Sequence, residues 1–416
     1  MKKAVSAIKG TKDILPQEIR LWQRLEGECK HVFELYGYRE IRTPVFEATE
    51  LFEKGTGITS DVVIKEMYTF TDKGGRSLTL RPEYTPSVVR AIIENRLYLQ
   101  PEPLRFYFIG PMFRYDKPQK GRFRQFHQVD IEVFDEKEPA VDAEIVEMAD
   151  FLLKRLGVKD IKILVNSVGC RKCRPSYLKV LREKASGAKD VLCPDCLRKL
   201  ESNPLRIFDC KIEACREAAR SFPKITDFLC AECGEHFSRF CGYLDAFGLT
   251  YTIEPKLVRG LDYYTKTTFE IVSRRLGAQD AVLGGGRYDD MMKEFGGPDI
   301  CGIGFAMGVE RIISLLSAVE EPRKMLFAAF LGQAALSKGM ELVRELRRQG
   351  IECLLEYKER SLKNQLSRAN KLGAAWVLII GENEIKKGVY GIKRMSDGVQ
   401  MEGDLKGILA FIGQPL

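Results

Sequence analysis

The sequence contains no apolar run close to the ~20 residues that a membrane-spanning helix needs. Its basic start, Met1–Ser6, lacks the apolar core of a signal peptide. We therefore expect a cytoplasmic protein with no membrane partner. A phosphate-binding loop ending in Lys-Ser or Lys-Thr is also missing, which argues against the P-loop class of nucleotide-binding proteins.

Length and charge set further limits. At 416 residues the chain is too long for one typical core, so we expect two or three domains. Its net charge of +8 is modest and permits a polyanionic partner without requiring one. The distribution is more informative, because six cations crowd one short segment with Asp116 as its only acid: Arg105, Arg114, Lys117, Lys120, Arg122 and Arg124.

Strand and turn patterns predict an antiparallel sheet in the first three quarters of the chain. Met67–Thr71 and Ser77–Leu80 form one predicted hairpin, and Arg105–Ile109 and Phe126–Phe134 another. Hairpins in sequence favour an antiparallel sheet over the parallel sheet of a Rossmann domain. Arg39–Phe46 is predicted as a strand that Pro44 interrupts.

A change of pattern near Glu320–Lys324 predicts the main domain boundary. Beyond it strands and helices alternate, which predicts a small α/β domain over 325–416. This domain has fourteen Lys or Arg against ten Asp or Glu, a net of +4. A predicted helix over 361–372 and the turn before it could track a phosphate backbone, although a solvated amphipathic helix is the alternative; the cations concerned are Lys358, Arg360, Lys363, Arg368 and Lys371.

The basic loop Phe113–Gln125 is the strongest local signal. Its arginines alternate with Tyr115 and Phe123, as a site for phosphate and stacked bases requires, although a charge run is usually a solvated face. Farther along, Gly302–Arg311 is predicted as a glycine loop entering a helix. Its GxGxxxG spacing differs from a dinucleotide fingerprint, so the glycines would let adenine approach the backbone while Arg311 reaches a phosphate. Gly284–Tyr288 is a similar case, in which glycines could lie against a ligand, but an ordinary turn is an equally good interpretation.

Two short segments add polar groups suited to a small substrate. Arg259–Thr265 places an arginine, a carboxylate and two tyrosines together, which suits phosphate and a small polar ring, but alone it could be an ordinary strand end. Glu83 and Thr85 follow a strand, where a buried carboxylate could hold an ammonium group. A surface position for Glu83 is the alternative.

Eight of the twelve cysteines lie between 170 and 233, within a predicted helical insertion at about 170–245. In a cytosolic protein this clustering favours metal binding over disulfides. Two pairs spaced Cys-x2-Cys nineteen residues apart fit one four-thiolate zinc site, Cys170, Cys173, Cys193 and Cys196. The other two pairs fit nearly as well: Cys210, Cys215, Cys230 and Cys233. At least one structural Zn²⁺ is predicted, and the alternative is that the thiols are small core residues.

Taken together, these segments resemble the histidyl-tRNA synthetases, a family of class II aminoacyl-tRNA synthetases, over essentially the whole chain. Lys9–Pro16 matches the family's start, Tyr38–Phe46 its dimer motif, Gly110–Phe134 its arginine-loop motif and Gly302–Arg311 its third motif. Two histidine-specific signatures match at Val258–Thr265 and Ala278–Tyr288. The resemblance implies an α+β protein, with a class II catalytic domain over 1–324 and an anticodon-binding domain over 325–416.

The resemblance also implies ligation of L-histidine to tRNA(His) with ATP and Mg²⁺, by a homodimer. Glu83 and Thr85 would bind the α-amino group of histidine. Arg114 and Arg259 would hold the histidine carboxylate and the α-phosphate of ATP. Arg122 and Arg311 would hold the outer phosphates and adenine. The pocket for the carboxylate and imidazole would be formed by Gln128, Glu132, Tyr263 and Tyr264.

Four positions depart from the family pattern. Tyr84, Pro86 and Asp130 stand where Gly, Ala and Gly are expected, and Ile58 stands where Glu is expected. A tyrosine in place of Gly at 84 could narrow the amino-acid pocket. The Thr-Pro pair after the acid resembles the corresponding residues of a non-catalytic paralogue that regulates ATP phosphoribosyltransferase. The alternative function is therefore that of a histidine-binding regulatory subunit that does not charge tRNA. That paralogue generally lacks the Arg-Gly-Leu-Asp-Tyr-Tyr signature and the C-terminal domain, and this chain has both.

Overall fold

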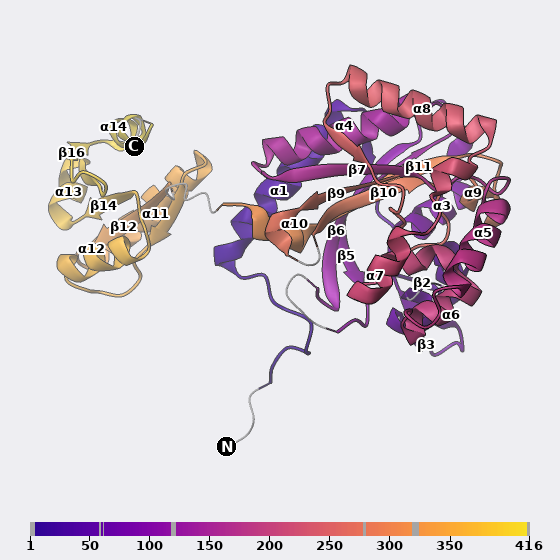
Figure 1. Ribbon diagram of the computed structural model, residues 1–416. Helices are drawn as coiled ribbons and strands as arrows, with labels where there is room; N and C mark the ends of the chain where they lie inside the picture. Colours follow the sequence, from indigo (N-terminus) through magenta and orange to yellow (C-terminus); the bar gives the residue numbers. More distant parts are fainter. Residues whose placement is uncertain are drawn as a thin grey trace. The chain divides into compact units, whose positions relative to one another are not determined.

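The computed structural model describes residues 5–57, 60, 62–117, 122–277, 280–317 and 324–413. The chain forms two compact units, Met1–Ala318 and Val319–Leu416 (Figure 1). Several sequence predictions fall outside the described residues: the departure at Ile58, the basic-loop residues 118–121 with Lys120, the start of the signature at Ala278, and most of the predicted boundary at 320–324. No helix among the described residues is long and apolar enough to span a membrane.

An eight-stranded sheet forms the centre of the first unit. Its six middle strands are antiparallel, as the hairpin pattern predicted, and only the two edge strands pair in parallel. In spatial order the strands are β1 (Arg39–Glu40), β5 (Arg105–Phe113), β6 (Gln125–Phe134), β11 (Gly302–Gly308), β10 (Ala281–Arg287), β9 (Thr265–Ser273), β7 (Ile161–Ser167) and β8 (Tyr251–Ile253).

Side-chain alternation along the strands separates a core face from a polar face. Val129, Ile131 and Val133 of β6 point into the main hydrophobic core. That core is completed by apolar residues of four helices that cover the same face (Figure 1): α1 (Pro16–Leu35), α4 (Pro139–Arg155), α8 (Ala231–Ala246) and α10 (Val309–Leu315). The intervening residues of β6 are polar and therefore face the opposite side.

A three-stranded sheet lies beside this structure, with the order β2 (Phe46–Ala48), β4 (Ser77–Leu80) and β3 (Tyr68–Thr71). It carries α2 (Thr49–Thr56), and α3 (Thr85–Glu94) follows β4, while the short α9 (Met291–Glu294) follows β10. The interruption predicted at Pro44 is present, but Arg39–Phe46 does not form a single strand. Its two ends are β1 and β2, which belong to different sheets, since Pro44 between them has no N–H to donate to a ladder.

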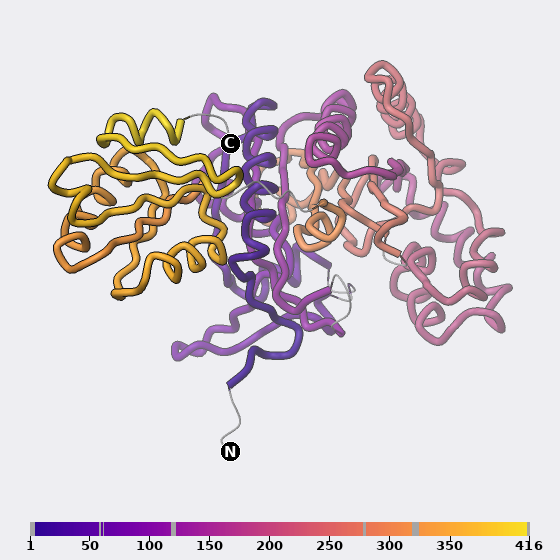
Figure 2. The backbone as a smooth tube through the Cα atoms, turned by 90° about the vertical axis from the view of Figure 1, so that its left-hand side faces the viewer, coloured from indigo at the N-terminus to yellow at the C-terminus, as the bar shows by residue number. Residues whose placement is uncertain are grey.

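Short helices fill the cysteine-rich segment, as predicted, and gather as a lobe of the first unit (Figure 2). They are α5 (Arg174–Ser186), α6 (Pro194–Ser202), η3 (Pro204–Asp209), α7 (Glu213–Arg220) and η4 (Ile225–Phe228), and α8 then leads back to the main sheet. This lobe has its own apolar core, which includes Tyr177, Leu181, Leu200, Ile207 and Ile225.

The second unit is the expected α/β domain. Its sheet is mixed, in the order β13 (Glu352–Leu355), β12 (Met325–Phe330), β14 (Trp376–Ile380), β15 (Tyr390–Arg394) and β16 (Gln400–Gly403). The helices are α11 (Gln333–Arg348), α12 (Leu362–Lys371), α13 (Glu382–Lys387) and α14 (Leu405–Ile412). Gln365 of α12 is fully buried. Its side chain accepts a hydrogen bond from Phe330 N (3.0 Å) and donates to Phe330 O (2.7 Å), which ties α12 to the end of β12.

Candidate active site

One face of the main sheet has small residues in place of large side chains. In β11, Ile303, Phe305 and Met307 enter the core, whereas Gly302, Gly304, Ala306 and Gly308 alternate with them on the opposite face. The glycine loop predicted before Arg311 is therefore wrong, because its glycines lie in β11, although the helix predicted after it is present as α10. The turn that was one alternative for Gly284–Tyr288 is also wrong, since Gly284–Gly286 lie in β10. The glycines act within strands, where they leave room above the sheet.

Large polar side chains lie in the space above these glycines. A Cβ at Gly284 would overlap the guanidinium of Arg259, and one at Gly304 would overlap the carboxylate of Glu132. Similarly, a Cβ at Gly302 would overlap the ring of Tyr288. The glycine-rich strands thus form the floor of a polar site, and their lack of side chains is a steric requirement of that site.

Three buried carboxylates line one end of the site: Glu83, Asp130 and Glu132. Glu132 accepts hydrogen bonds from Thr85 Oγ1 (2.5 Å) and from the Tyr288 hydroxyl, and Glu83 accepts one from the Tyr263 hydroxyl (3.0 Å). The surface alternative for Glu83 is therefore wrong. Burial raises the pKa of Glu83 and raises the pKa of Glu132 to about 8. Burial, Glu132 and Glu83 together raise the pKa of Asp130 well above its usual range.

Four arginines line the other end, and they come from three separate motifs. Burial and the nearby guanidinium groups of Arg122, Arg114 and Arg259 lower the pKa of Arg311, with Glu270 as an opposing negative charge. Arg259 forms an ion pair with Glu270, with 2.7 Å between Nη1 and Oε1. Such a group of like charges favours binding of a polyanion that can neutralise them.

Hydrogen bonds hold the two arginines of the basic segment. Arg114 Nε donates to Pro82 O (2.8 Å), just before Glu83, and Arg122 forms a 2.5 Å ion pair with Asp116. Glu310, at the start of α10, accepts hydrogen bonds from the backbone N–H of His127 (2.9 and 3.0 Å). That contact fixes α10, with Arg311 next to it, against the start of β6.

The structure thus brings the predicted site residues to one face, in two groups. Tyr263 and Tyr264 lie side by side, with ring centroids 4.7 Å apart, and Gln128 lies on the same face of β6 as Glu132. Sequence reasoning missed Glu270 and Tyr288 as site residues. Glu270 is the only acid of β9 and lies between the apolar residues Phe269 and Ile271, and this signal could have identified it.

The hydroxyl group of Tyr84 points away from the carboxylate end of the site. Its ring stacks on Phe108, with centroids 3.7 Å apart, and its hydroxyl donates to Ile41 O (2.7 Å). The ring is buried among apolar residues of α3 and β5. Tyr84 therefore packs in an apolar cluster. Its contacts do not support the expectation that it narrows the amino-acid pocket.

The eight clustered cysteines form two groups, but in a different pairing from the one predicted. The outer cluster is Cys170, Cys173, Cys230 and Cys233, and the inner cluster is Cys193, Cys196, Cys210 and Cys215. The sulfur atoms of each cluster lie within 4.8 Å of one another, and all eight thiols are free. The first cysteine pair along the chain meets the fourth at the base of the lobe, and the second meets the third within it. The prediction paired neighbours in sequence and did not account for the lobe folding back on its base.

Backbone N–H groups support both clusters. Cys230 N donates to Cys173 Sγ (3.1 Å), and Cys193 N donates to Cys215 Sγ (3.2 Å). Backbone donation by Cys196 lowers the pKa of Cys193 to about 7. Burial opposes ionisation of Cys170, but backbone N–H donors outweigh it and its pKa is also about 7. One thiol of each cluster thus has a lowered pKa, whereas burial raises the pKa of Cys196 and of Cys233.

Comparison with known proteins is consistent with this geometry. A family model described as "Histidyl-tRNA synthetase" matches residues 10–312, and one described as "Anticodon binding domain" matches 327–414. The chain belongs to the histidyl-tRNA synthetase family. It is 48% identical to a histidine–tRNA ligase of Desulforamulus reducens, over 97% of this chain and 98% of that one. The corresponding protein of Halothermothrix orenii is 47% identical over 96% of both chains.

A solved structure agrees over the full length. The apo histidyl-tRNA synthetase of S. aureus has a TM-score of 0.83 and 34% identity, and the match covers 99% of this chain and 100% of that one. The class II synthetase fold expected from the sequence is therefore confirmed, with an anticodon-binding domain that has a sheet of its own.

The glycine floor gives a direct test of this site. Replacing Gly284 with Ala should displace the Arg259 guanidinium and lower the rate of amino-acid activation by about 10²-fold, the scale expected from a misplacement of about 1 Å. Steady-state kinetics would measure the loss. Gly391→Ala is the matched control, because Gly391 also lies in a strand and an added Cβ there meets only an ordinary contact, 3.8 Å from Ile379. Equal rates in the two variants would contradict the steric role of Gly284.

Proposed function

We propose a mechanism in which the two charged ends of the site join histidine to ATP before tRNA is charged. Histidine–tRNA ligation is the activity of this chain, since it belongs to the histidyl-tRNA synthetase family. In the first step a carboxylate oxygen of histidine attacks the α-phosphorus of ATP and pyrophosphate leaves. In the second step a hydroxyl at the 3′ end of tRNA(His) attacks the carbonyl carbon of the adenylate, and AMP and a proton are released.

The carboxylate end would receive the amino acid. Glu83 and Thr85 would bind the α-ammonium group, and Glu83 is already oriented by the Tyr263 hydroxyl. Gln128, Glu132, Tyr263 and Tyr264 would enclose the rest of histidine, with Glu132 accepting from an imidazole N–H. Tyr288, which donates to Glu132, would keep that carboxylate in place.

The arginine end would receive ATP, with Mg²⁺ entering as part of the substrate complex. Arg114 and Arg259 would hold the reacting carboxylate and the α-phosphate. Arg122 and Arg311 would hold the outer phosphates and adenine. The attacking carboxylate is ionised at neutral pH, so no general base is needed, and catalysis would come from in-line positioning and from cations placed where negative charge grows.

One observation supports this assignment most strongly. Four arginines converge at one end of a site whose other end contains three buried carboxylates. A ligand with a positive group at one end and phosphates at the other would relieve both unfavourable charge groups. Histidine and ATP bound together have this distribution of charge, and the α-phosphate that remains in histidyl-adenylate keeps part of it.

Replacing Arg259 with Ala should reduce adenylate formation by about 10²–10³-fold, the usual cost of removing one transition-state donor. Histidine affinity should change much less, because Glu83 and the tyrosines remain. Histidine-dependent exchange of labelled pyrophosphate into ATP measures the first step directly. Near-normal exchange in the variant would assign the central cation to another residue. Absence of exchange in the wild type would instead favour the regulatory paralogue.

The raised pKa of Glu132 predicts a pH effect on histidine binding. With a pKa of about 8, Glu132 is mostly protonated at pH 7 in the free site, whereas the ionised form accepts best from an imidazole N–H. The KM for histidine should therefore fall as pH rises from 7 to 8. Folding stability should change in the opposite sense: because the folded state binds the extra proton, stability is lost as pH rises from the unfolded value toward 8.

Pyrophosphate exchange at graded histidine concentrations across this pH range would measure the effect. Glu132→Gln is the control, since its amide does not titrate and its KM should vary less with pH. The same pH dependence in both proteins would place the titrating group elsewhere.

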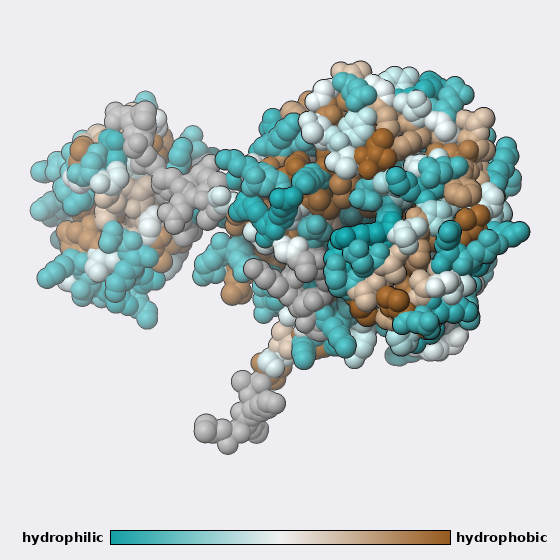
Figure 3. Space-filling view, in the orientation of Figure 1, coloured by the Kyte–Doolittle hydropathy of each residue, from teal (hydrophilic) through white to brown (hydrophobic). Residues whose placement is uncertain are grey.

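The second unit would bind the anticodon region of tRNA. Figure 3 shows hydrophilic side chains, with hydrophobic ones among them, on the visible face of the second unit. Among the five predicted RNA-binding cations, however, Arg368 pairs with buried Glu356 (3.0 Å) and Arg360 lies 3.8 Å from the same carboxylate. These two arginines therefore stabilise the turn after β13. Exposed Lys358, Lys363 and Lys371 remain the better candidates for phosphate contacts.

Reversing Lys358 and Lys363 to Glu should weaken tRNA binding and reduce its salt dependence, because two phosphate contacts would be lost. Binding at several salt concentrations, measured by filter retention or fluorescence anisotropy, checks this. Lys406→Glu is the control, a charge reversal on α14, which is not part of the predicted RNA-binding surface on α12 and the turn before it. Unchanged affinity in the double variant would place the RNA-binding face elsewhere.

Assembly and metal content complete the proposal. We infer a homodimer, and its support is the dimer motif together with Phe46 and Phe70, which are half-exposed on the three-stranded sheet. The two cysteine clusters would each hold a structural Zn²⁺. A cytoplasmic location fits this chemistry, because clustered free thiols persist in a reducing compartment.

A further inference from the structure

The insertion packs its hydrophobic core around the segment that carries the pocket tyrosines. This segment, residues 258–264, is called the amino-acid loop below. Tyr264 is a member of the insertion's apolar core, and Tyr263 and Leu261 pack at its edge. Asn203, just after α6, donates a 2.7 Å hydrogen bond to Asp262. The tyrosines that would contact histidine therefore depend on the insertion for their position.

Arg174 links the amino-acid loop directly to the outer cysteine cluster. It follows Cys173 and is the first residue of α5. Its Nε donates to Val168 O (3.1 Å), and its Nη2 donates to the backbone carbonyl of Tyr264. Arg174 is partly buried, so its two hydrogen bonds to backbone carbonyls are only partly exposed to solvent. A shift of Cys173 would move Arg174 and release the carbonyl of Tyr264.

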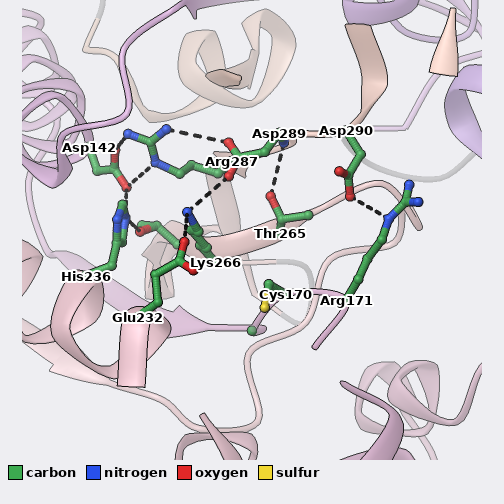
Figure 4. Close-up of polar contacts among 12 residues, drawn as sticks. Asp142, Cys170, Arg171, Glu232, His236, Thr265, Lys266, Arg287, Asp289 and Asp290 are labelled. Atoms are coloured by element: carbon green, nitrogen blue, oxygen red, sulfur yellow. Dashed lines mark hydrogen bonds and ion pairs between the residues drawn. The ribbon is translucent and has the colours of Figure 1, made fainter. Parts of the chain in front are cut away.

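Ion pairs around the outer cluster connect it to the strands that frame the pocket (Figure 4). Arg171, next to Cys170, pairs with Asp290 (2.7 Å) beyond β10. Lys266, two residues after Tyr264, pairs with Glu232 of α8 (3.2 Å), which lies between Cys230 and Cys233. The cluster thus lies between the base of the insertion and the start of β9.

The base of α8 is fixed to the sheet by a second, fully buried set of contacts. His236 Nε2 lies 2.9 Å from Asp142, and Arg287 Nε donates to the same carboxylate oxygen (2.9 Å) (Figure 4). Arg287 is adjacent to Tyr288, which donates to Glu132 in the site. The α8 side of the outer cluster, which carries Cys233, is therefore fixed to the sheet. If the cluster lost its metal, we expect Cys173 and Arg174 to move instead.

Sulfur geometry in the outer cluster suits a tetrahedral ion. Cys170 Sγ lies 3.6 Å from Cys173 Sγ and 4.0 Å from Cys230 Sγ. Tetrahedral zinc with Zn–S bonds of about 2.3 Å separates its sulfur ligands by about 3.8 Å, whereas a disulfide would bring them to about 2.05 Å. Two further N–H donors, from Lys172 to Cys170 Sγ (3.4 Å) and from Cys230 to Cys173 Sγ (3.1 Å), would support bound thiolates.

We propose that a zinc ion in the outer cluster positions the amino-acid loop through Arg174, so that occupancy of this cluster sets the affinity for histidine. The inner cluster joins α6, η3 and α7 to one another and would stabilise the insertion. Arg174 is a positioning residue, since it contacts the backbone of Tyr264 and no reacting group. This inference rests on the proposed histidine site, and it assigns control of that site to a metal held outside it.

The first test compares Cys170→Ser with Cys241→Ser, a half-buried thiol on α8 outside both clusters. Purified reduced wild type should contain two zinc ions per chain, and Cys170→Ser should retain one. Its KM for histidine in pyrophosphate exchange should rise about tenfold while the KM for ATP changes less than twofold, because only ground-state binding of the amino acid is weakened. Cys241→Ser should match the wild type in both readouts.

The second test leaves the metal in place. Arg174→Gln should keep two zinc ions per chain and still raise the KM for histidine about tenfold, and Arg174→Lys should restore part of the affinity. Arg198→Gln is the control, an exposed arginine of the insertion that pairs with Asp195. If Cys170→Ser fails to fold, the Arg174 variants decide the matter.

Three results would overturn the inference: wild type without zinc, loss of one ion with unchanged KM for histidine, or wild-type kinetics in Arg174→Gln. A wild type with no histidine-dependent exchange would instead overturn the proposed function. The two failures are therefore distinguishable.

Discussion

Burial of charged groups, with like charges close together, is the constraint on which the site depends. Arg114, Arg122, Arg259 and Arg311 come from different parts of the chain, and the pKa of Arg311 is lowered by burial and by the other three. At the other end, burial raises the pKa values of Glu83, Asp130 and Glu132, and neighbouring carboxylates add to the rise for Asp130 and Glu132. Neither group would be held together unless the fold stabilised it, and a substrate of opposite charge would relieve both.

The fold meets this cost through the sheet. Strands β6, β10 and β11 put their large apolar side chains on one face, where four helices cover them, and leave the other face to glycines and polar groups. Pairing contacts such as Arg259 with Glu270 and Thr85 with Glu132 then fix individual side chains over the glycine floor. A rigid sheet thereby holds groups that would separate in a flexible loop.

Much of this could be predicted from the sequence, because it depends on local pattern. The hairpins, the C-terminal α/β unit and the site residues of the signature motifs follow from short-range periodicity or from recognisable residue order. The failures depend on long-range pairing. Gly302–Gly308 has the spacing of a loop but lies between β6 and β10, and the cysteine pairs close in nested order because the lobe folds back on its base. The prediction that Arg360 and Arg368 contact RNA stays a prediction, and the structure adds that both lie beside the buried carboxylate of Glu356.

A crystal structure of the protein with a non-hydrolysable histidyl-adenylate analogue would test the central claim most directly. The account predicts the α-amino group within hydrogen-bonding distance of Glu83 and the imidazole beside Glu132. The phosphate or its sulfamoyl substitute should lie between Arg114 and Arg259, above Gly284. An analogue bound in the reverse sense, or with its phosphate away from both arginines, would contradict the account.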